Sequence, residues 1–219
     1  CFMEVSSHGI AQHRVSGLNF NGGVFTNLTH DHLDYHGSFK NYRDIKKVFF
    51  DLLPPKAFAL SNTDDKNGMY MMQNTKAKKI HYALKRAADY QAKILEQQFS
   101  GMLLKINNQE LWTALVGNFN AYNLLAVFAT TEQLGVDPLE VLKQLSKLKS
   151  LVGRFQIFQT KEETTIIIDY AHTPDALENV LKTINAIRTR NEMILTIVGC
   201  GGNRDKKKRP IMGKISTSY

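Results

Sequence analysis

Apolar side chains recur along the chain at two different spacings, and this difference separates predicted helices from predicted strands. In residues 38–53 they fall three or four positions apart, as at Tyr42 and Ile45, which is the period of an amphipathic helix. Two prolines directly afterwards end this pattern, because proline cannot continue a helix. Residues 118–134 repeat the helical spacing and precede Gly135, a residue type common just beyond helix ends. The spacing therefore predicts two long helices.

Short apolar runs bounded by glycine, asparagine or other polar residues predict β-strands. The polar dipeptides at 100–101 and 107–108 lie between later runs and favour antiparallel neighbours there. In the first two thirds of the chain these runs are residues 2–5, 22–27, 57–60, 79–83, 90–97, 102–106 and 111–116.

The pattern changes after the middle of the chain. Residues 164–168 form a β-branched run that predicts a buried strand, and residues 173–174 carry the threonine and proline of a helix start. Residues 193–198 predict a second buried strand. Strand, helix and strand in this order are typical of a βαβ unit in a parallel sheet. We therefore expect two domains, residues 1–151 and residues 152–219.

Composition narrows the class of protein. The chain has 219 residues, of which 43% are hydrophobic and 22% charged, so a disordered or fibrous protein is excluded. Its two cysteines exclude a disulfide scaffold and suit a reducing compartment such as the cytoplasm. No apolar run approaches the ~20 residues of a membrane span. The chain begins within a predicted strand and ends as a helix begins, so we expect a fragment.

The net charge of +8 favours anionic ligands such as phosphates. Basic and aromatic residues do not alternate as they do in proteins that bind single-stranded nucleic acid, so a nucleic-acid partner is not expected. No membrane or obligate protein partner is indicated either.

Ionisable residues gather where two predicted strands end. Glu4 lies at the C-terminal end of the first predicted strand, and an oxygen ligand at the end of a strand suits Mg²⁺. Residues 26–37 hold three histidines and two aspartates, a density that favours a functional site over a plain polar turn. A zinc site built from His30, His32 and His36 is one alternative, although no cysteine lies nearby.

Further polar residues mark other candidate sites. The amides of Asn120 and Asn123 can share one side of a helix and suit the edges of a base or ribose. Arg154 lies at the expected domain boundary, where it could reach a phosphate from either domain. Asp169 directly follows a predicted strand. Arg204 follows a glycine-rich stretch and could grip a carboxylate or phosphate. No phosphate-binding GxxxxGK[ST] loop occurs in the chain.

Taken together and in this order, these stretches resemble the Mur ligase family, ATP-dependent enzymes that join amino acids to the peptidoglycan precursor. EVSSHGIAQHRV and TNLTHDHLDYHG resemble most the members that add the third residue of the stem peptide. The resemblance implies an α/β fold: a partial central ATPase domain, with a mostly parallel sheet and a small antiparallel sheet, followed by the start of a Rossmann-like C-terminal domain. The family's first domain, its P-loop and most of its C-terminal domain have no counterpart here.

The resemblance also implies roles for individual residues. The implied Mg²⁺ ligands are Glu4, His32 and Lys46, the last as the family's carbamylated lysine. The positions that match contacts to the UDP-muramoyl dipeptide are Ser6, Gln12 and Arg14. The position that matches a grip on the incoming amino acid is Arg204. The positions that match contacts to the nucleotide are Asn120, Asn123, Arg154 and Asp169. The implied catalytic residues are His32, Lys46 and Arg154.

The implied function is ATP-dependent formation of an amide bond through an acyl phosphate. The substrates would be ATP, UDP-MurNAc-L-Ala-D-Glu and a third amino acid, either diaminopimelate or lysine. Alternatives are a ligase like folylpolyglutamate synthase, or a non-catalytic remnant. Because the P-loop that cradles the β- and γ-phosphates is missing, we expect the chain by itself to be inactive.

Overall fold

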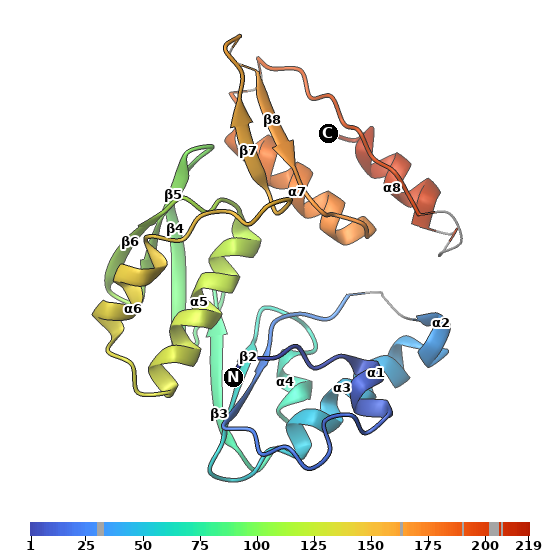
Figure 1. The fold of residues 1–219 in the computed structure, drawn as a ribbon, viewed down its shortest axis with the longest axis vertical. Coiled ribbons are helices and arrows are strands. Elements are labelled where there is room, and N and C mark those ends of the chain that lie inside the picture. The colour runs from blue at the N-terminus through green and yellow to red at the C-terminus, as the bar shows by residue number, and fades with distance from the viewer. Residues whose placement is uncertain (30–32, 163, 190, 202–205, 207) are drawn as a thin grey trace. The chain divides into compact units, whose positions relative to one another are not determined.

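The fold is described from a computed structural model, which covers residues 1–29, 33–162, 164–189, 191–201, 206 and 208–219 (Figure 1). Helices and strands are interspersed in the first part of the chain, and four strands in succession precede the longest of the described helices. The helices are α1 Ser7–Ala11, α2 Leu33–His36, α3 Phe39–Asp51, α4 Gly68–Met71, α5 Asn118–Gln133, α6 Pro138–Leu145, α7 Pro174–Ile187 and α8 Lys208–Ser216. The strands are β1 Gly22–Phe25, β2 Phe58–Asn62, β3 Lys78–Ala83, β4 Tyr90–Gln98, β5 Gly101–Ile106, β6 Gln109–Thr113, β7 Gln156–Gln159 and β8 Thr165–Ile168.

Six strands form one sheet in the order β1-β2-β3-β4-β5-β6. β1 pairs with β2, β2 with β3, and β3 with β4, all in parallel. β2 is buried at every position, as expected for a parallel strand covered on both faces. The mostly parallel sheet expected from the sequence is confirmed. The later strands β4, β5 and β6 continue this sheet, and the structure's two-stranded antiparallel sheet is β7–β8.

The core of the first part lies between this sheet and helices α3 and α4. Phe25 and Ala59 from the strands pack with Phe50, Leu53 and Met71. All five side chains are at most 4% exposed, so this cluster fixes α3 against the sheet through apolar burial.

Both long helices predicted from the apolar spacing are confirmed. α3 begins where the Ser38 hydroxyl accepts a hydrogen bond from the Asn41 amide at 3.2 Å, and it ends just before the two prolines. α5 ends at Gln133, two residues before Gly135, whose φ of 86° lies in the left-handed region that favours glycine. The helix expected from residue 173 is also confirmed, because the Thr173 hydroxyl caps α7 by accepting from the Ala176 amide at 3.3 Å.

The contacts between residues divide the chain into two compact units. The first unit comprises Cys1–Lys93, Ile106–Gln109 and Tyr122–Leu142. The second unit comprises Ile94–Lys105, Glu110–Ala121 and Lys143–Tyr219. The division into domains 1–151 and 152–219 stays a prediction.

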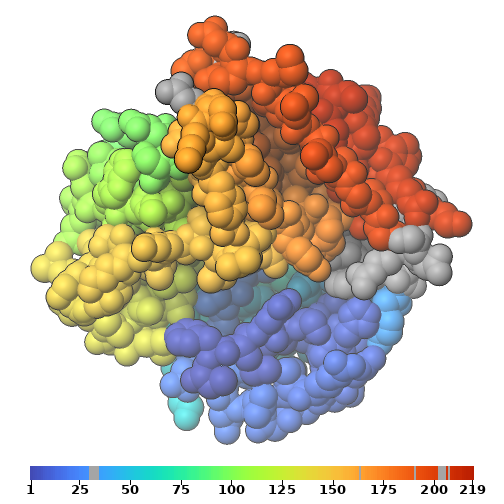
Figure 2. Space-filling view, turned by 45° about the horizontal axis from the view of Figure 1, so that its top comes forward, coloured from blue at the N-terminus to red at the C-terminus, as the bar shows by residue number. Residues whose placement is uncertain are grey.

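The expected strand at residues 2–5 is wrong. These residues have no regular secondary structure, and Phe2 and Met3 are 77% and 51% exposed. The N-terminal residues lie at the surface in Figure 2, coloured dark blue. A strand needs hydrogen bonds to a neighbouring strand, and this segment pairs with none of the described strands.

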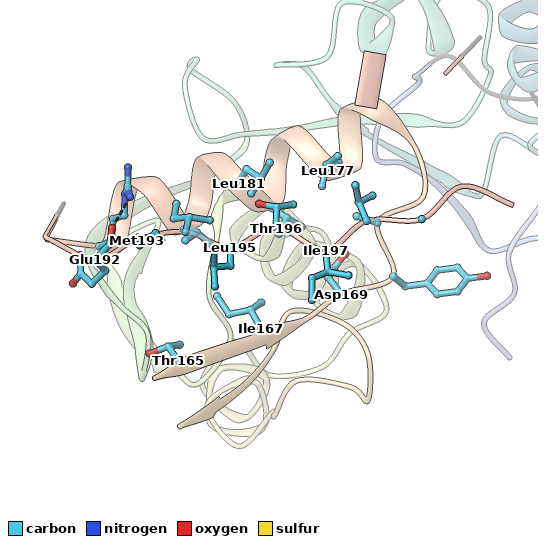
Figure 3. Close-up of a pocket in the computed structure, with 18 of the residues that line it drawn as sticks. Thr165, Ile167, Asp169, Leu177, Leu181, Glu192, Met193, Leu195, Thr196 and Ile197 are labelled. Carbon is cyan, nitrogen blue, oxygen red and sulfur yellow. Dashed lines mark hydrogen bonds between the residues drawn. The ribbon is translucent and has the colours of Figure 1, made fainter. Parts of the chain in front are cut away.

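The expected parallel βαβ unit is also wrong. β8 is antiparallel to β7, and Ile166 and Ile168 are 45% and 47% exposed, so β8 is not a buried strand. Residues 193–198 form no strand, and Ile197 is fully exposed. The sheet formed by β7 and β8 has two strands, and so small a sheet gives a further strand little support. Residues 193–198 instead line a pocket of about 1120 Å³ in the second unit, where Leu177 and Leu181 of α7 lie across from Ile167 of β8 (Figure 3).

Candidate active site

The polar residues after the N-terminal segment are organised by the short helix α1. Ser6 is its N-cap, and the Ser6 hydroxyl accepts a hydrogen bond from the Gly9 amide at 3.0 Å. Gln12 and Arg14 follow the helix, and the Arg14 guanidinium donates to the Gln12 side-chain oxygen. The Gln12 amide in turn donates to the Tyr35 hydroxyl at 3.4 Å. Gln12 and Arg14 are exposed, so both can meet a ligand from solvent.

Glu4 and Lys46 line the same pocket, which has a volume of about 820 Å³. Glu4 comes from the N-terminal segment and Lys46 from α3, and Thr26 at the end of β1 lines the pocket as well. The Lys46 ammonium lies 5.5 Å from the centre of the Tyr42 ring. Two of the three expected metal ligands thus line one pocket, although they are separated by more than forty residues of sequence.

A buried hydrogen bond joins the two segments that carry these ligands. Nε2 of His36 lies 2.9 Å from the Ser7 hydroxyl oxygen, and both residues are buried. The His36 ring stacks on Tyr42 at a centroid distance of 5.3 Å. His8 and Tyr35 close the cluster, with their ring centroids 4.0 Å apart. This cluster of rings fixes α1 against the start of α3, and therefore positions Ser6 relative to Lys46.

The histidine-rich stretch is described only in part. His30 and His32 lie outside the described residues, so the expected roles of His32 as a metal ligand and catalytic residue stay predictions. His36 directs its Nε2 to Ser7 and packs among aromatic rings, which favours a positioning role over the zinc alternative. Within the described parts of the chain, no group of three or more histidine, cysteine, aspartate or glutamate side chains could hold a metal ion.

The first turns of α5 carry the two expected nucleotide-contacting amides. Gly117 precedes the helix with a φ of 99°. The Asn120 amide donates to the Val116 carbonyl at 2.8 Å, so part of its hydrogen-bonding capacity is used within the helix. Asn123 is exposed, so a ligand can reach its amide from solvent.

The polar side chains of residues 62–65, at the end of β2 and in the turn that follows it, were not identified as functional from the sequence. The Asn62 amide donates to the Thr26 carbonyl at 2.9 Å. The Asp65 carboxylate accepts from the Leu28 amide at 3.0 Å, and the Asp64 carboxylate accepts from the Tyr122 hydroxyl at 2.8 Å. The signal was present, because polar residues follow a strand here as they do after β1.

The electrostatics of this turn reach two tyrosines. Burial, together with the hydrogen bond to Asp64, raises the pKa of Tyr122 far above its usual value. Burial also raises the pKa of Tyr82, and the Tyr82 hydroxyl donates to the Phe25 carbonyl at 3.3 Å. Both phenols therefore keep their protons and act as hydrogen-bond donors at neutral pH.

Arg154 and Asp169 occur together in the second unit. The Asp169 carboxylate accepts from the Phe155 amide at 2.8 Å, and the Arg154 guanidinium lies 4.7 Å from the centre of the Tyr170 ring. Phe155 is fully buried and has a φ of 45°, a left-handed conformation that is rare for a bulky residue. Asp169 also lines the pocket of the second unit (Figure 3). The expected partner in amino-acid binding, Arg204, lies outside the described residues.

Comparison with known families decides how these groups are to be interpreted. Residues 1–131 match the Mur ligase middle domain, and residues 153–219 match the Mur ligase, glutamate ligase domain. The chain belongs to the Mur ligase family. The family expected from the sequence motifs is thus confirmed.

Individual Mur ligases give the same picture. The UDP-N-acetylmuramoyl-L-alanyl-D-glutamate–2,6-diaminopimelate ligase of Parabacteroides distasonis is 57% identical over 213 residues, 97% of this chain and 44% of the relative. The ligase of that name from Geobacillus thermodenitrificans is 40% identical over 228 residues, 99% of this chain and 46% of the relative. The chain therefore spans less than half the length of these relatives.

Solved Mur ligase structures share the fold. A UDP-N-acetylmuramoyl-L-alanyl-D-glutamate–2,6-diaminopimelate ligase superposes with a TM-score of 0.73 at 33% identity, over 98% of this chain and 45% of that chain. The UDP-N-acetylmuramate–alanine ligase of Thermotoga maritima has a TM-score of 0.62 at 26% identity, over 75% of this chain and 38% of that chain. The α/β fold class expected from the sequence is confirmed.

The described residues fit a divalent cation in part. Glu4 lines the pocket of the first unit and carries carboxylate oxygens, the ligand atoms that Mg²⁺ prefers. Lys46 fits only after modification, because an ammonium repels a cation whereas a carbamate supplies anionic oxygens. Among the helices of the described residues, none has both the length and the apolar character that crossing a membrane requires.

Proposed function

We propose that the whole protein containing this chain is an ATP-dependent ligase that adds diaminopimelate to UDP-MurNAc-L-Ala-D-Glu. The observation that carries the proposal is that Glu4 and Lys46 line one pocket. Ser6 caps the start of the nearby helix α1, and Gln12 and Arg14 follow its end. The choice of diaminopimelate is supported by the names of relatives that are 57% and 52% identical. The chain by itself lacks a P-loop and is not expected to turn over.

The proposed reaction proceeds in two steps. A carboxylate oxygen of the D-glutamyl residue attacks the γ-phosphorus of ATP, the bond to the β–γ bridging oxygen breaks, and ADP leaves. The amine of diaminopimelate then attacks the acyl carbon of the acyl phosphate, inorganic phosphate leaves, and the amine loses a proton. Because several anions must converge, catalysis is mainly positioning and charge neutralisation.

In this proposal the N-terminal residues hold the muramoyl dipeptide. The Arg14 guanidinium is a permanent cation that can pair with a carboxylate or a phosphate, and its bond to Gln12 limits its motion. The Ser6 hydroxyl is oriented by its capping bond to the Gly9 amide. These residues bind and orient the substrate, and the cluster around His36 keeps them fixed relative to Lys46.

The pocket shared by Glu4 and Lys46 is the proposed place of charge neutralisation. Addition of CO₂ to the Lys46 amine, with loss of a proton, would replace a cation with an anionic group whose oxygens can ligate. Glu4, His32 and the modified Lys46 would hold Mg²⁺, which supplies neutralisation of the phosphate charge when bound. The roles of Lys46 and His32 in catalysis stay proposals.

The nucleotide is assigned to residues from α5 and the later part of the chain. Asn120 and Asn123 offer amides suited to a base or ribose, Asp169 follows β8, and Arg154 carries the charge that suits a phosphate. Arg204 is assigned to the carboxylate of the incoming amino acid. Since ATP and a UDP-linked precursor are cytoplasmic metabolites, we place the reaction in the cytoplasm.

The test is amide formation by the whole protein with a panel of amino acids. With ATP and UDP-MurNAc-L-Ala-D-Glu, meso-diaminopimelate should give a tripeptide product and one ADP per amide. Product with L-lysine alone would correct the amino acid and keep the ligase. Product only with a folate acceptor and glutamate, or no ATP-dependent product with any acceptor, would overturn the proposal.

A further inference from the structure

The turn after β2 ties together three separate segments of the first unit. Its Asn62 and Asp65 side chains bond the backbone at Thr26 and Leu28, 36 and 37 residues away. Thr26 and Leu28 belong to the segment that follows β1 and leads into the histidine-rich stretch. The turn thus fixes the segment between β1 and the histidine-rich stretch.

Asp64, in the same turn, bonds to residues that come later in the chain. One of its carboxylate oxygens, Oδ2, accepts from the amides of Leu84 and Lys85, just after β3, at 2.7 and 2.9 Å. The same oxygen accepts from the Tyr122 hydroxyl at 2.8 Å, across 58 residues of sequence. A single carboxylate oxygen therefore joins the end of β3 to the first turns of α5.

Burial of the Asp64 carboxylate costs free energy. The Asp64 side chain is 6% exposed, and its other oxygen, Oδ1, is buried without a hydrogen-bond partner among the described residues. The nearest cation, Nε of Arg86, is 4.0 Å from Oδ1, too far for a hydrogen bond. An unsatisfied buried acceptor is unfavourable, so a neutral residue of similar size would fill this position at lower cost if Asp64 served only to fill space.

The Tyr122 hydroxyl adds a polar constraint to the rotation of α5 about its own axis, which the buried side chains of Leu124 and Leu125 also hold. Successive residues on a helix point about 100° apart, so fixing the Tyr122 hydroxyl also fixes the direction of its neighbour Asn123. Asn123 is exposed and is one of the two amides assigned to the nucleotide. Loss of the Tyr122 bond would therefore loosen the direction of Asn123 at the start of α5 without releasing the helix from the core.

We propose that Asp64 and Tyr122 form a positioning pair for nucleotide binding, in which the Asp64 carboxylate holds the Tyr122 hydroxyl so that Asn123 faces the nucleotide. This inference rests on the proposed function, since the role of Asn123 belongs to it. Neither residue touches the nucleotide. The pair acts on ground-state binding, so its loss raises the KM for ATP and leaves kcat unchanged.

The experiment compares Tyr122→Phe with a chemically matched variant in the whole protein. Tyr70 also donates its hydroxyl to an aspartate, Oδ1 of Asp44, at 2.8 Å, so Tyr70→Phe removes an equivalent bond elsewhere in the same unit. Tyr122→Phe should raise the Kd for ATP and the KM for ATP roughly tenfold, which corresponds to about 1.4 kcal/mol. Tyr70→Phe should leave the Kd for ATP within twofold of the original.

A conservative variant separates positioning from folding. Asp64→Asn keeps an oxygen that can accept from Tyr122 but removes the charge, so its Kd for ATP should lie between those of the original protein and Asp64→Ala. If Asp64 and Tyr122 served folding alone, Asp64→Asn and Asp64→Ala would lower the melting temperature and the active fraction without changing the KM for ATP. That result, or an unchanged Kd in Tyr122→Phe, overturns the proposal.

The direct binding measurement keeps the two proposals distinguishable. If the original whole protein binds ATP but forms no amide, the proposed function fails and the Kd of Tyr122→Phe still decides the role of the pair. If the original whole protein binds no ATP, both proposals are overturned.

Discussion

A methyl group added at Gly68 tests the close packing of the turn after β2. A Cβ at this position would lie 1.9 Å from the Asn62 carbonyl oxygen and 2.9 Å from its carbonyl carbon. To restore a separation of 3.0 Å, the backbone must shift by 1.1 Å, and the obstructing atoms belong to the backbone and not to a flexible side chain. The shift would strain the bond from the Ser61 hydroxyl to the Gly68 carbonyl, which is 2.9 Å long.

Overpacking of this kind costs about 1–3 kcal/mol. Native-state hydrogen exchange measures this local loss of stability at the amide of Met71. This amide donates to the carbonyl of Asn67, the N-cap of α4, at 3.0 Å. In Gly68→Ala this amide should exchange about 5- to 150-fold faster. Gly213→Ala is the control, because nothing lies within 4 Å of a Cβ there and alanine favours a helix by about 1 kcal/mol. Exchange at Met71 within twofold of the original in Gly68→Ala would refute this reasoning.

Three further predictions concern the proposed site. Lys46→Ala in the whole protein should lose ligation, and short carboxylic acids added to the assay should restore part of it; failure of every acid to rescue would count against a carbamate on Lys46. Arg154→Ala should abolish ligation and leave binding of the muramoyl dipeptide within twofold, whereas unchanged turnover would contradict the role of Arg154. Burial raises the pKa values of Tyr122 and Tyr82 above the ordinary tyrosine value of about 10. The contribution of these protonated phenols to folding stability is therefore fully present below about pH 10 and is lost as pH rises further. An ultraviolet titration should therefore show two tyrosines that ionise last, of which Tyr122→Phe removes one; loss of an early-ionising tyrosine would contradict the assignment.

Local signals in the sequence predicted the elements whose ends are fixed by neighbouring residues. Ser38 and Thr173 cap their helices through bonds that span three residues, so both helix starts could be identified from the sequence. The apolar runs of β1 and β2 likewise predicted these two strands, because each run is bounded by polar residues or turns, whereas their parallel pairing was implied by the family resemblance.

The errors have a common physical origin in contacts between distant residues. Residues 2–5 and 193–198 have the composition of strands, but a strand exists only with a hydrogen-bonded neighbour, and apolar content does not show whether that neighbour is present. The contacts made by the turn after β2 could not be predicted for a related reason. Its function depends on contacts such as Asp64 with Tyr122 and Asp65 with Leu28, which span 58 and 37 residues.

The candidate site was predictable mainly through its motifs. Carboxylates and amides at strand ends and helix starts could be assigned to ligands on physical grounds, but a metal-ligand role for Lys46 could not, because an unmodified lysine repels cations. The structure adds that Glu4 and Lys46 line one pocket. It also adds the bond between His36 and Ser7, which no spacing in the sequence indicates.

The most direct test of the proposed ligase follows oxygen during turnover. The whole protein is supplied with ATP, diaminopimelate and UDP-MurNAc-L-Ala-D-Glu labelled with ¹⁸O in the D-glutamyl carboxylates. An acyl phosphate transfers one carboxylate oxygen to the phosphate that leaves, so the released phosphate should carry one ¹⁸O atom for each amide formed. Amide formation with unlabelled phosphate, or release of ADP and phosphate without any amide, would contradict the account.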